Sequence, residues 1–207
     1  MSSPLDLGTL QVMLMTYLDR GRRAYDGRAW KDAHELLSLA DRENALHPGD
    51  LERLATAAFL IGRETEFERT LERAHQAYRD AGDRPGAARC AFWIGIRLFL
   101  SGKIGAATGW LARGQRLLDQ EGRETVEEGY LLLPVAEQHL RAGEWDRALV
   151  VAREATGFGT RLGDRDLIAG ARHVEGKTLL EMGRVEEGFA LLDEAMVEVM
   201  SAELSPL

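Results

Sequence analysis

The side chains able to do chemistry are scattered along this chain and form no pattern that a reaction requires. The histidine pair of a zinc-binding helix is missing, since the five histidines are never within one helical turn of each other and stand at positions 34, 47, 75, 139 and 173. His34-Glu35 begins like a metalloprotease helix, but Ser38 stands where the second histidine would be. Cys90 is the only cysteine, which excludes an internal disulfide. We therefore expect no metal site and no enzyme.

Patterns that bind cofactors are also missing. No glycine-rich run ends in Gly-Lys-Ser or Gly-Lys-Thr, as a phosphate-binding loop does. The segment 157–159 followed by Gly163 resembles a dinucleotide fingerprint, but the spacing is one residue too long and no strand precedes it. A loop at a helix end is the better interpretation. The sequence predicts no cofactor.

Charge and hydropathy restrict the partners of this chain. The 207 residues include 26 basic and 34 acidic side chains, and the net charge is −8. An acidic field repels polyanions, so we expect no direct binding of nucleic acid. No apolar run approaches the ~20 residues that span a bilayer, and no basic stretch followed by an apolar core opens the chain. We expect a cytoplasmic protein with no membrane contact.

Glycines recur along the chain at a fixed interval. Two interleaved series run through it, one at positions 62, 102, 143 and 183, the other at positions 82, 122 and 163. The spacing within each series is 40 or 41 residues, so a glycine falls every 20 or 21 residues. Such a period indicates stacked helical or helix-containing units, because one unit cannot bury its apolar face alone.

The segments between these glycines are predicted to be helices. They are rich in Ala, Leu, Arg and Glu, and their apolar residues recur at three and four, as at Leu51, Leu54 and Ala58. A glycine ends each helix, and Asp83 and Asp164 are expected to cap the helices that follow. We expect about ten helices in antiparallel pairs, near residues 5–26, 29–46, 49–61, 64–80, 84–101, 103–119, 124–142, 144–161, 164–182 and 184–201.

Small residues at the expected helix crossings resemble the tetratricopeptide pattern. An aromatic or apolar residue opens the second helix of a pair and a small residue follows three places later, as in Trp30…Ala33 and Trp145…Ala148. The repeat near 40 residues is longer than the usual 34. This long variant is similar to the repeat regions of LuxR-type bacterial transcriptional regulators and related signal-transduction proteins.

The resemblance implies an all-α, right-handed superhelical array of about five helix pairs. It implies a single domain over residues 1–207, with pairs near 5–46, 49–80, 84–119, 124–161 and 164–201. No glycine stands near residue 203, where the series would continue. We therefore expect the chain to be a fragment of a longer array.

In tetratricopeptide arrays the first helix of each pair lines a concave groove, and the resemblance implies ligand binding there. Aromatic, apolar and charged groups together could anchor a peptide or a helix. Arg89 and Lys177 are the most informative candidates, unless they simply pair with Glu137 or Glu181 across the groove. The predicted groove residues are Arg89, Phe92, Ile96, Phe99, Tyr130, Leu133, Glu137, His173 and Lys177.

Three functions remain open from the sequence. The first is an interaction or scaffolding module that binds a peptide, a partner helix or another subunit, as the sensor segment of a bacterial transcriptional regulator. The second is a small-molecule sensor, which would need an enclosed pocket of some hundreds of Å³. The third is a homodimer formed through the last helix, where Val185, Phe189 and Met196 would expose an apolar face. Pro134 is expected to kink its helix, and a kink could widen the groove.

Overall fold

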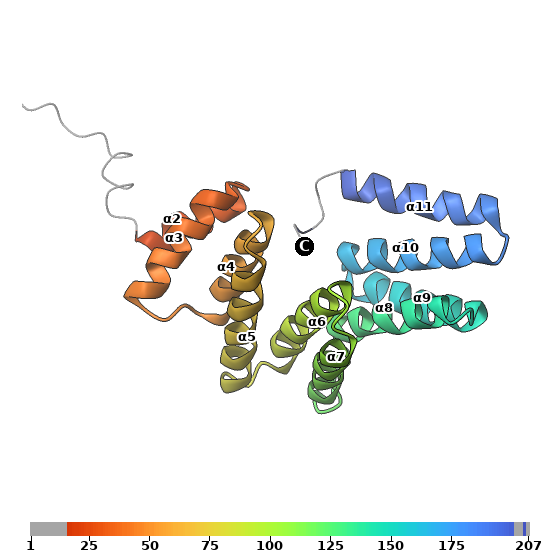
Figure 1. Ribbon diagram of the computed structural model, residues 1–207, viewed down its shortest axis with the longest axis horizontal. Coiled ribbons are helices and arrows are strands. Elements are labelled where there is room, and N and C mark those ends of the chain that lie inside the picture. The colour runs from red at the N-terminus through yellow and green to blue at the C-terminus, as the bar shows by residue number, and fades with distance from the viewer. Residues whose placement is uncertain (1–15, 201–204, 206–207) are drawn as a thin grey trace, which may run out of the picture. The chain divides into compact units, whose positions relative to one another are not determined.

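The computed structural model describes residues 16–200 and residue 205, and the regular structure within these residues is entirely α-helical (Figure 1). The two helices of each pair are antiparallel and pack together. The helices are α2 (Tyr17–Asp26), α3 (Trp30–Glu43), α4 (Pro48–Leu60), α5 (Glu64–Asp80), α6 (Arg84–Leu100), α7 (Ile104–Leu118), α8 (Val126–Arg141), α9 (Trp145–Leu162), α10 (Arg165–Glu181) and α11 (Val185–Met200).

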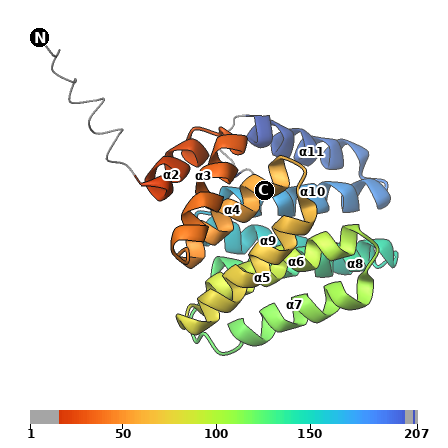
Figure 2. The same cartoon turned by 60° about the vertical axis from the view of Figure 1, so that its left-hand side comes forward.

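This arrangement confirms the predicted all-α array of helix pairs. The helix bounds agree with the sequence-based bounds to within about three residues, except at the start of the first helix. There, residues 5–15 lie outside the described part of the chain. We call the first helix of each pair the A-helix and the second the B-helix. In both Figure 1 and Figure 2 the A-helix α10 and the B-helix α11 of the last pair lie side by side.

The chain divides into two compact units, residues 1–81 and 82–207. The first unit contains α2 to α5, and the second contains α6 to α11. Each unit is described by itself below. The expectation of one continuous superhelical domain stays a prediction.

The glycine series ends the helices as expected. All seven glycines have φ between 70° and 80°, the left-handed conformation that residues with a Cβ avoid. A Cβ built on any of them meets no other atom within 4 Å, so the backbone conformation and not space requires glycine. One series turns the chain within pairs and the other turns it between pairs. At the first turn the left-handed residue is Arg28, with φ 57°.

The predicted aspartate caps are confirmed. An Asp83 carboxylate oxygen accepts a hydrogen bond from the backbone N–H of Gly86 at 2.9 Å. Asp164 accepts one from Leu167 at 2.7 Å. Each cap satisfies a backbone donor that the first helical turn leaves unpaired. These caps fix where α6 and α10 begin.

Small residues let the two helices of a pair approach closely. A Cβ on Gly176 of α10 would lie 3.0 Å from the carbonyl oxygen of Gly188 on α11, and one on Gly95 of α6 would lie 2.8 Å from Leu111 on α7. The tetratricopeptide-like small positions are all buried. They are Ala33, Ala55, Ala74, Gly95, Ala107, Gly114, Ala136, Ala148, Ala155, Gly176, Gly188 and Ala195.

Candidate functional site

The A-helices of the second unit are joined to one another by side-chain contacts. Between α6 and α8, Arg89 Nη1 donates to Glu127 Oε1 at 2.8 Å, and the rings of Phe92 and Tyr130 lie 5.3 Å apart. Between α8 and the start of α10, the Tyr130 hydroxyl donates to Asp164 Oδ1 at 3.0 Å. These contacts place α6, α8 and α10 side by side.

Several residues predicted to line the groove contribute to the hydrophobic core. Phe92 is only 4% exposed and packs with Ala88, Leu118 and Leu131. The other predicted apolar residues of this region, Ile96, Tyr130 and Leu133, are partly buried against the same cluster. The burial of the Tyr130 hydroxyl, together with the nearby Asp164 carboxylate, raises its pKa above the ordinary value. These side chains hold the A-helices together.

A second group of predicted residues lies at the surface and forms one contiguous cluster. Lys177 Nζ lies 3.1 Å from both carboxylate oxygens of Glu137, and Arg141 Nε lies 3.3 Å from Glu137 Oε1. The Arg141 guanidinium stacks over the ring of Phe99, 4.4 Å from its centre. We call Phe99, Glu137, Arg141, His173 and Lys177 the A-face cluster. It brings together residues of all three A-helices in this unit.

A surface depression of about 400 Å³ lies at the A-face cluster. It is lined by Glu137, Leu140, Arg141, Lys177, Leu180 and Glu181. Two cations of the cluster share the carboxylate of Glu137, and Glu181 adds a second carboxylate to the lining of the depression. Partial burial lowers the pKa of His173, nearby Lys177 lowers it further, and Glu137 opposes both effects. A neutral imidazole can both donate and accept hydrogen bonds.

The two basic residues singled out from the sequence have different surroundings. Lys177 pairs with Glu137, as the alternative interpretation expected. Arg89 pairs with Glu127, and not with Glu137 or Glu181. The Glu127 side chain is buried, and helical spacing alone gave no sign of that burial. The Arg89 and Lys177 side chains are about equally exposed, at 37% and 39%, so the difference lies in their partners, which are the buried Glu127 and the partly exposed Glu137.

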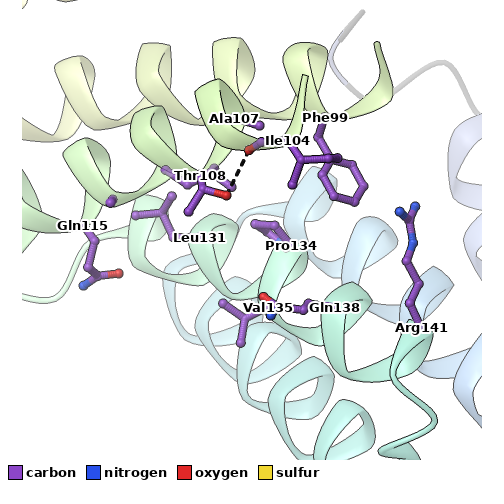
Figure 3. A pocket seen from close by; sticks show the side chains of 12 residues that line it. Phe99, Ile104, Ala107, Thr108, Gln115, Leu131, Pro134, Val135, Gln138 and Arg141 are labelled. Carbon is purple, nitrogen blue, oxygen red and sulfur yellow. Dashed lines mark hydrogen bonds between the residues drawn. The ribbon is translucent and has the colours of Figure 1, made fainter. Parts of the chain in front are cut away.

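A pocket of about 510 Å³ lies between the B-helix α7 and the A-helix α8 (Figure 3). Its walls include Phe99, Ile104, Leu111, Leu131, Pro134 and Val135. The sequence predicted ligand binding only at residues of the A-helices, and the α7 wall of the pocket was therefore missed. Pro134 was the available signal, since a proline inside a helix interrupts its hydrogen bonds. Helix α8 continues through Pro134, and the predicted kink stays a prediction.

The last described helix exposes an apolar surface, as the sequence predicted. At least half of each of the side chains of Val185, Phe189, Met196 and Val199 is exposed. Leu192 of the same helix lies against Gly176 of α10. The helix also carries five acidic residues and no basic residue.

Metal sites and membrane-spanning helices are two further features to consider in the described part of the chain. Within residues 16–200 and 205, no group of three or more His, Cys, Asp or Glu side chains is arranged to hold a metal ion. Within the same residues, no helix has the length and apolar character required to cross a membrane.

No family model and no curated protein matches this chain, but solved structures resemble it. The quorum sensor NprR from B. thuringiensis, in its apo form, has a TM-score of 0.68 and 14% identity, over 90% of this chain and 54% of the other. This chain thus spans about half of that one. BtubC from P. vanneervenii has a TM-score of 0.59 and 15% identity, over 89% and 80% of the two chains.

A third similar structure is a putative kinesin light chain from Podosopora anserina with nearly identical TPR-like repeats. Its TM-score is 0.55 at 13% identity, over 88% of this chain and 92% of the other. At such identities the likeness shows the fold alone. The protein has a tetratricopeptide-like repeat fold, which typically serves as a scaffold for protein interactions and is usually non-catalytic.

Proposed function

We propose that this protein is an interaction module whose second unit binds a segment of a partner protein at the A-face cluster. The observation that carries the proposal is the meeting of an aromatic ring, two cations and a carboxylate beside a surface depression, on adjacent A-helices. Aromatic and arginine side chains at the edge of a pocket are typical centres of binding energy in protein interfaces. Phe99 and Arg141 supply that combination.

The charges of the cluster favour a partner segment with at least one carboxylate. Lys177 and Arg141 share Glu137, so each cation retains donors for an incoming anion. Complementary charges set the orientation of a bound segment more than they raise its affinity. A side chain entering the depression beside Leu140 and Leu180 would add apolar contact.

The cellular role that we propose is the sensor segment of a cytoplasmic bacterial regulator. The similarity to NprR, whose structure is described as a quorum sensor, supports this role, and so does the long repeat seen in the sequence. In such a role, partner binding at the A-face cluster would be passed to another segment or subunit as a change in helix packing.

Small-molecule sensing is the second candidate function, and the pocket between α7 and α8 favours it. A volume of about 510 Å³ lies within the range of roughly 300–1,000 Å³ found for small-molecule sites. This pocket also touches the A-face cluster, because two members of the cluster, Phe99 and Arg141, are among the residues that line the pocket. A ligand there could change how the cluster is presented.

Affinity capture from a lysate of the source organism tests the interaction proposal. The informative variant exchanges the two charges, Glu137→Lys with Lys177→Glu, because it keeps the net charge while it reverses the polarity of the pair and places a lysine beside Arg141. We expect it to lose the partners recovered by the wild type.

The matched control is Asp41→Arg with Arg73→Asp. This pair joins the B-helices α3 and α5 at 2.8 Å and lies outside the cluster. The control should recover the same partners as the wild type. Unchanged recovery by the Glu137/Lys177 exchange would exclude the A-face cluster as the binding surface.

A further inference from the structure

The pocket between α7 and α8 is an elongated slot with chemically different ends. Because the two helices are antiparallel, Ile104 at the start of α7 lies near the end of α8, where Arg141 stands. Figure 3 shows the Arg141 side chain at one end of the slot, Gln115 at the other, and Leu131 and Pro134 between them. We propose that this slot binds a small amphiphile, with an aliphatic tail along the walls and a carboxylate at Arg141. The inference rests on the small-molecule-sensing candidate and names its ligand class.

The walls of the slot suit an aliphatic tail. Ile104 and Leu111 of α7 face Leu131, Pro134 and Val135 of α8 across it. Ile104 is 50% exposed and Val135 is 41% exposed, so both present apolar surface that a ligand would remove from water. Burial of that surface supplies affinity without requiring a specific tail structure.

The equivalent space is filled at the next junction between helix pairs, where α9 is followed by α10. Val174 of α10 stands 40 residues after Pro134, at the equivalent place in the repeat. Val174 is buried against Ala136 of α8 and Ala152 of α9, so side chains of the protein fill the space there. The slot is therefore a feature of the α7–α8 junction in particular and not of every junction between pairs.

The polar end of the slot suits a carboxylate. Arg141 is the only charged residue among the described residues that line it, in a chain with a net charge of −8. Stacking on Phe99 holds the guanidinium plane in place. Among the described residues only Glu137 accepts a hydrogen bond from Arg141, and it does so at Nε over 3.3 Å. The two Nη groups are thus available for a two-point contact with a carboxylate.

Glu137 does not cancel this preference, because it is already neutralised. Both of its carboxylate oxygens contact Lys177 Nζ at 3.1 Å. Arg141 is the charged group that a ligand carboxylate would meet in the slot, whereas Glu181 lines the adjoining depression. A neutral or cationic head group would leave the two Nη groups of Arg141 without an anionic partner.

Binding of three probes with the same tail tests the inference, with the full chain and by calorimetry below the probes' micelle concentrations. The probes are decanoate, decanol and decyltrimethylammonium. We expect decanoate to bind about ten-fold more tightly than decanol, the effect of one charge-assisted contact. The cationic probe should bind more weakly than decanol.

Two variants connect this preference to the slot. Arg141→Gln should abolish the advantage of decanoate over decanol, whereas Arg147→Gln, on an exposed arginine of α9, should preserve it. Val135→Trp should fill the slot and weaken both probes, while Val150→Trp, at an exposed valine of α9 outside the slot, should not. Circular dichroism and the unfolding midpoint verify that each variant is folded.

The possible failures are distinct. Equal affinity for decanoate and decanol, with loss of both in Val135→Trp, would overturn the carboxylate preference while small-molecule binding stands. Failure of the folded wild type to bind any of the three probes would overturn the inference. It would also remove the pocket as support for small-molecule sensing. The inference would also be overturned if Val150→Trp weakened binding of the probes as much as Val135→Trp does, because the loss would then not depend on the slot.

Discussion

Lys177 on α10 contacts both carboxylate oxygens of Glu137 on α8, with each distance 3.1 Å. The two residues stand 40 positions apart, which is one repeat. The pair therefore links equivalent faces of neighbouring A-helices. Both side chains remain partly exposed, so the pair can take part in binding as well as in packing.

Reversal of one charge of this pair should destabilise the protein, and exchange of both should restore part of that stability. Lys177→Glu places two carboxylates together, and we expect the free energy of unfolding to fall by about 1 kcal/mol. The double variant with Glu137→Lys should recover only part of that loss, because it restores an ion pair between the two sites but places a lysine beside Arg141. Urea unfolding measures all three proteins. Equal stability of the single and double variants would show that the pair contributes no energy.

Close packing of α8 against α9 and α10 predicts a cost at one glycine, whereas an open position on α7 predicts a gain at another. A Cβ on Gly129 would lie 2.5 Å from Leu167 Cδ2 and 2.7 Å from Phe158 Cβ, so α8 must move away from its neighbours. We expect Gly129→Ala to cost about 2 kcal/mol. Gly109 of α7 has nothing within 4 Å, and Gly109→Ala should stabilise by about 0.8 kcal/mol through helix propensity.

Thermal and urea unfolding of the two alanine variants test this contrast. A Gly129→Ala variant as stable as the wild type would contradict close packing of α8 at this position. Gly109→Ala is the control for the general effect of alanine in a helix.

In the first unit, Asp50 should make stability depend on acid pH. Its carboxylate is nearly fully buried and accepts hydrogen bonds from Arg22 at 2.8 and 2.6 Å and from Arg53 at 3.0 Å. The hydrogen bonds from Arg22 are the main cause that lowers the pKa of Asp50 below its ordinary value of 3.8. The unfolded chain therefore binds the proton more readily. The stabilisation is present above the unfolded pKa and is lost as the pH falls through the folded one.

Asp50→Asn should cost about 2 kcal/mol at pH 7, because two partly exposed arginines lose their anionic partner. The gap between variant and wild type should narrow below about pH 4. Chemical unfolding at several pH values measures it, and Asp193→Asn on exposed α11 is the control. A gap of constant size from pH 7 to pH 3 would contradict this assignment.

The exposed apolar surface of α11 predicts concentration-dependent association. Phe189 and Met196 are 55% and 58% exposed, and we expect their replacement by glutamine to raise solubility while the unfolding free energy changes by less than ~0.5 kcal/mol. The homodimer predicted from the sequence would appear as an apparent mass that rises with concentration in light scattering. A constant monomer mass across that series would exclude it. The five acidic residues of the helix oppose such pairing.

Local signals made the fold readable from the sequence. The seven glycines at positions 62 to 183 mark left-handed turns, and a left-handed turn is a demand of the backbone that few other residues meet. Asp83 and Asp164 mark helix starts for an equally local reason, since a cap bonds to the turn that follows it. Each signal acts within a few residues, so a single sequence reveals it.

The candidate site was less readable, because burial is decided between helices. Phe92 and Phe99 stand seven residues apart on α6, yet Phe92 is in the core while Phe99 lines a pocket. Helical spacing places both on one face and does not say how far the neighbouring helix covers it. Helical spacing likewise did not reveal the α7 wall of the pocket, because it does not say which residues of α7 the helix α8 leaves uncovered.

Site-specific photocrosslinking is a direct test of partner binding at the A-face cluster. Benzoylphenylalanine placed at His173, an exposed position of the A-face cluster, is compared with the same group at Val150, an exposed position on the B-helix α9. Both proteins are expressed in the source organism and irradiated, and crosslinked partners are identified by mass spectrometry. We predict a specific crosslinked protein from position 173 that is absent from position 150. Crosslinks from position 150 alone, or the same products from both, would contradict binding at the A-face cluster.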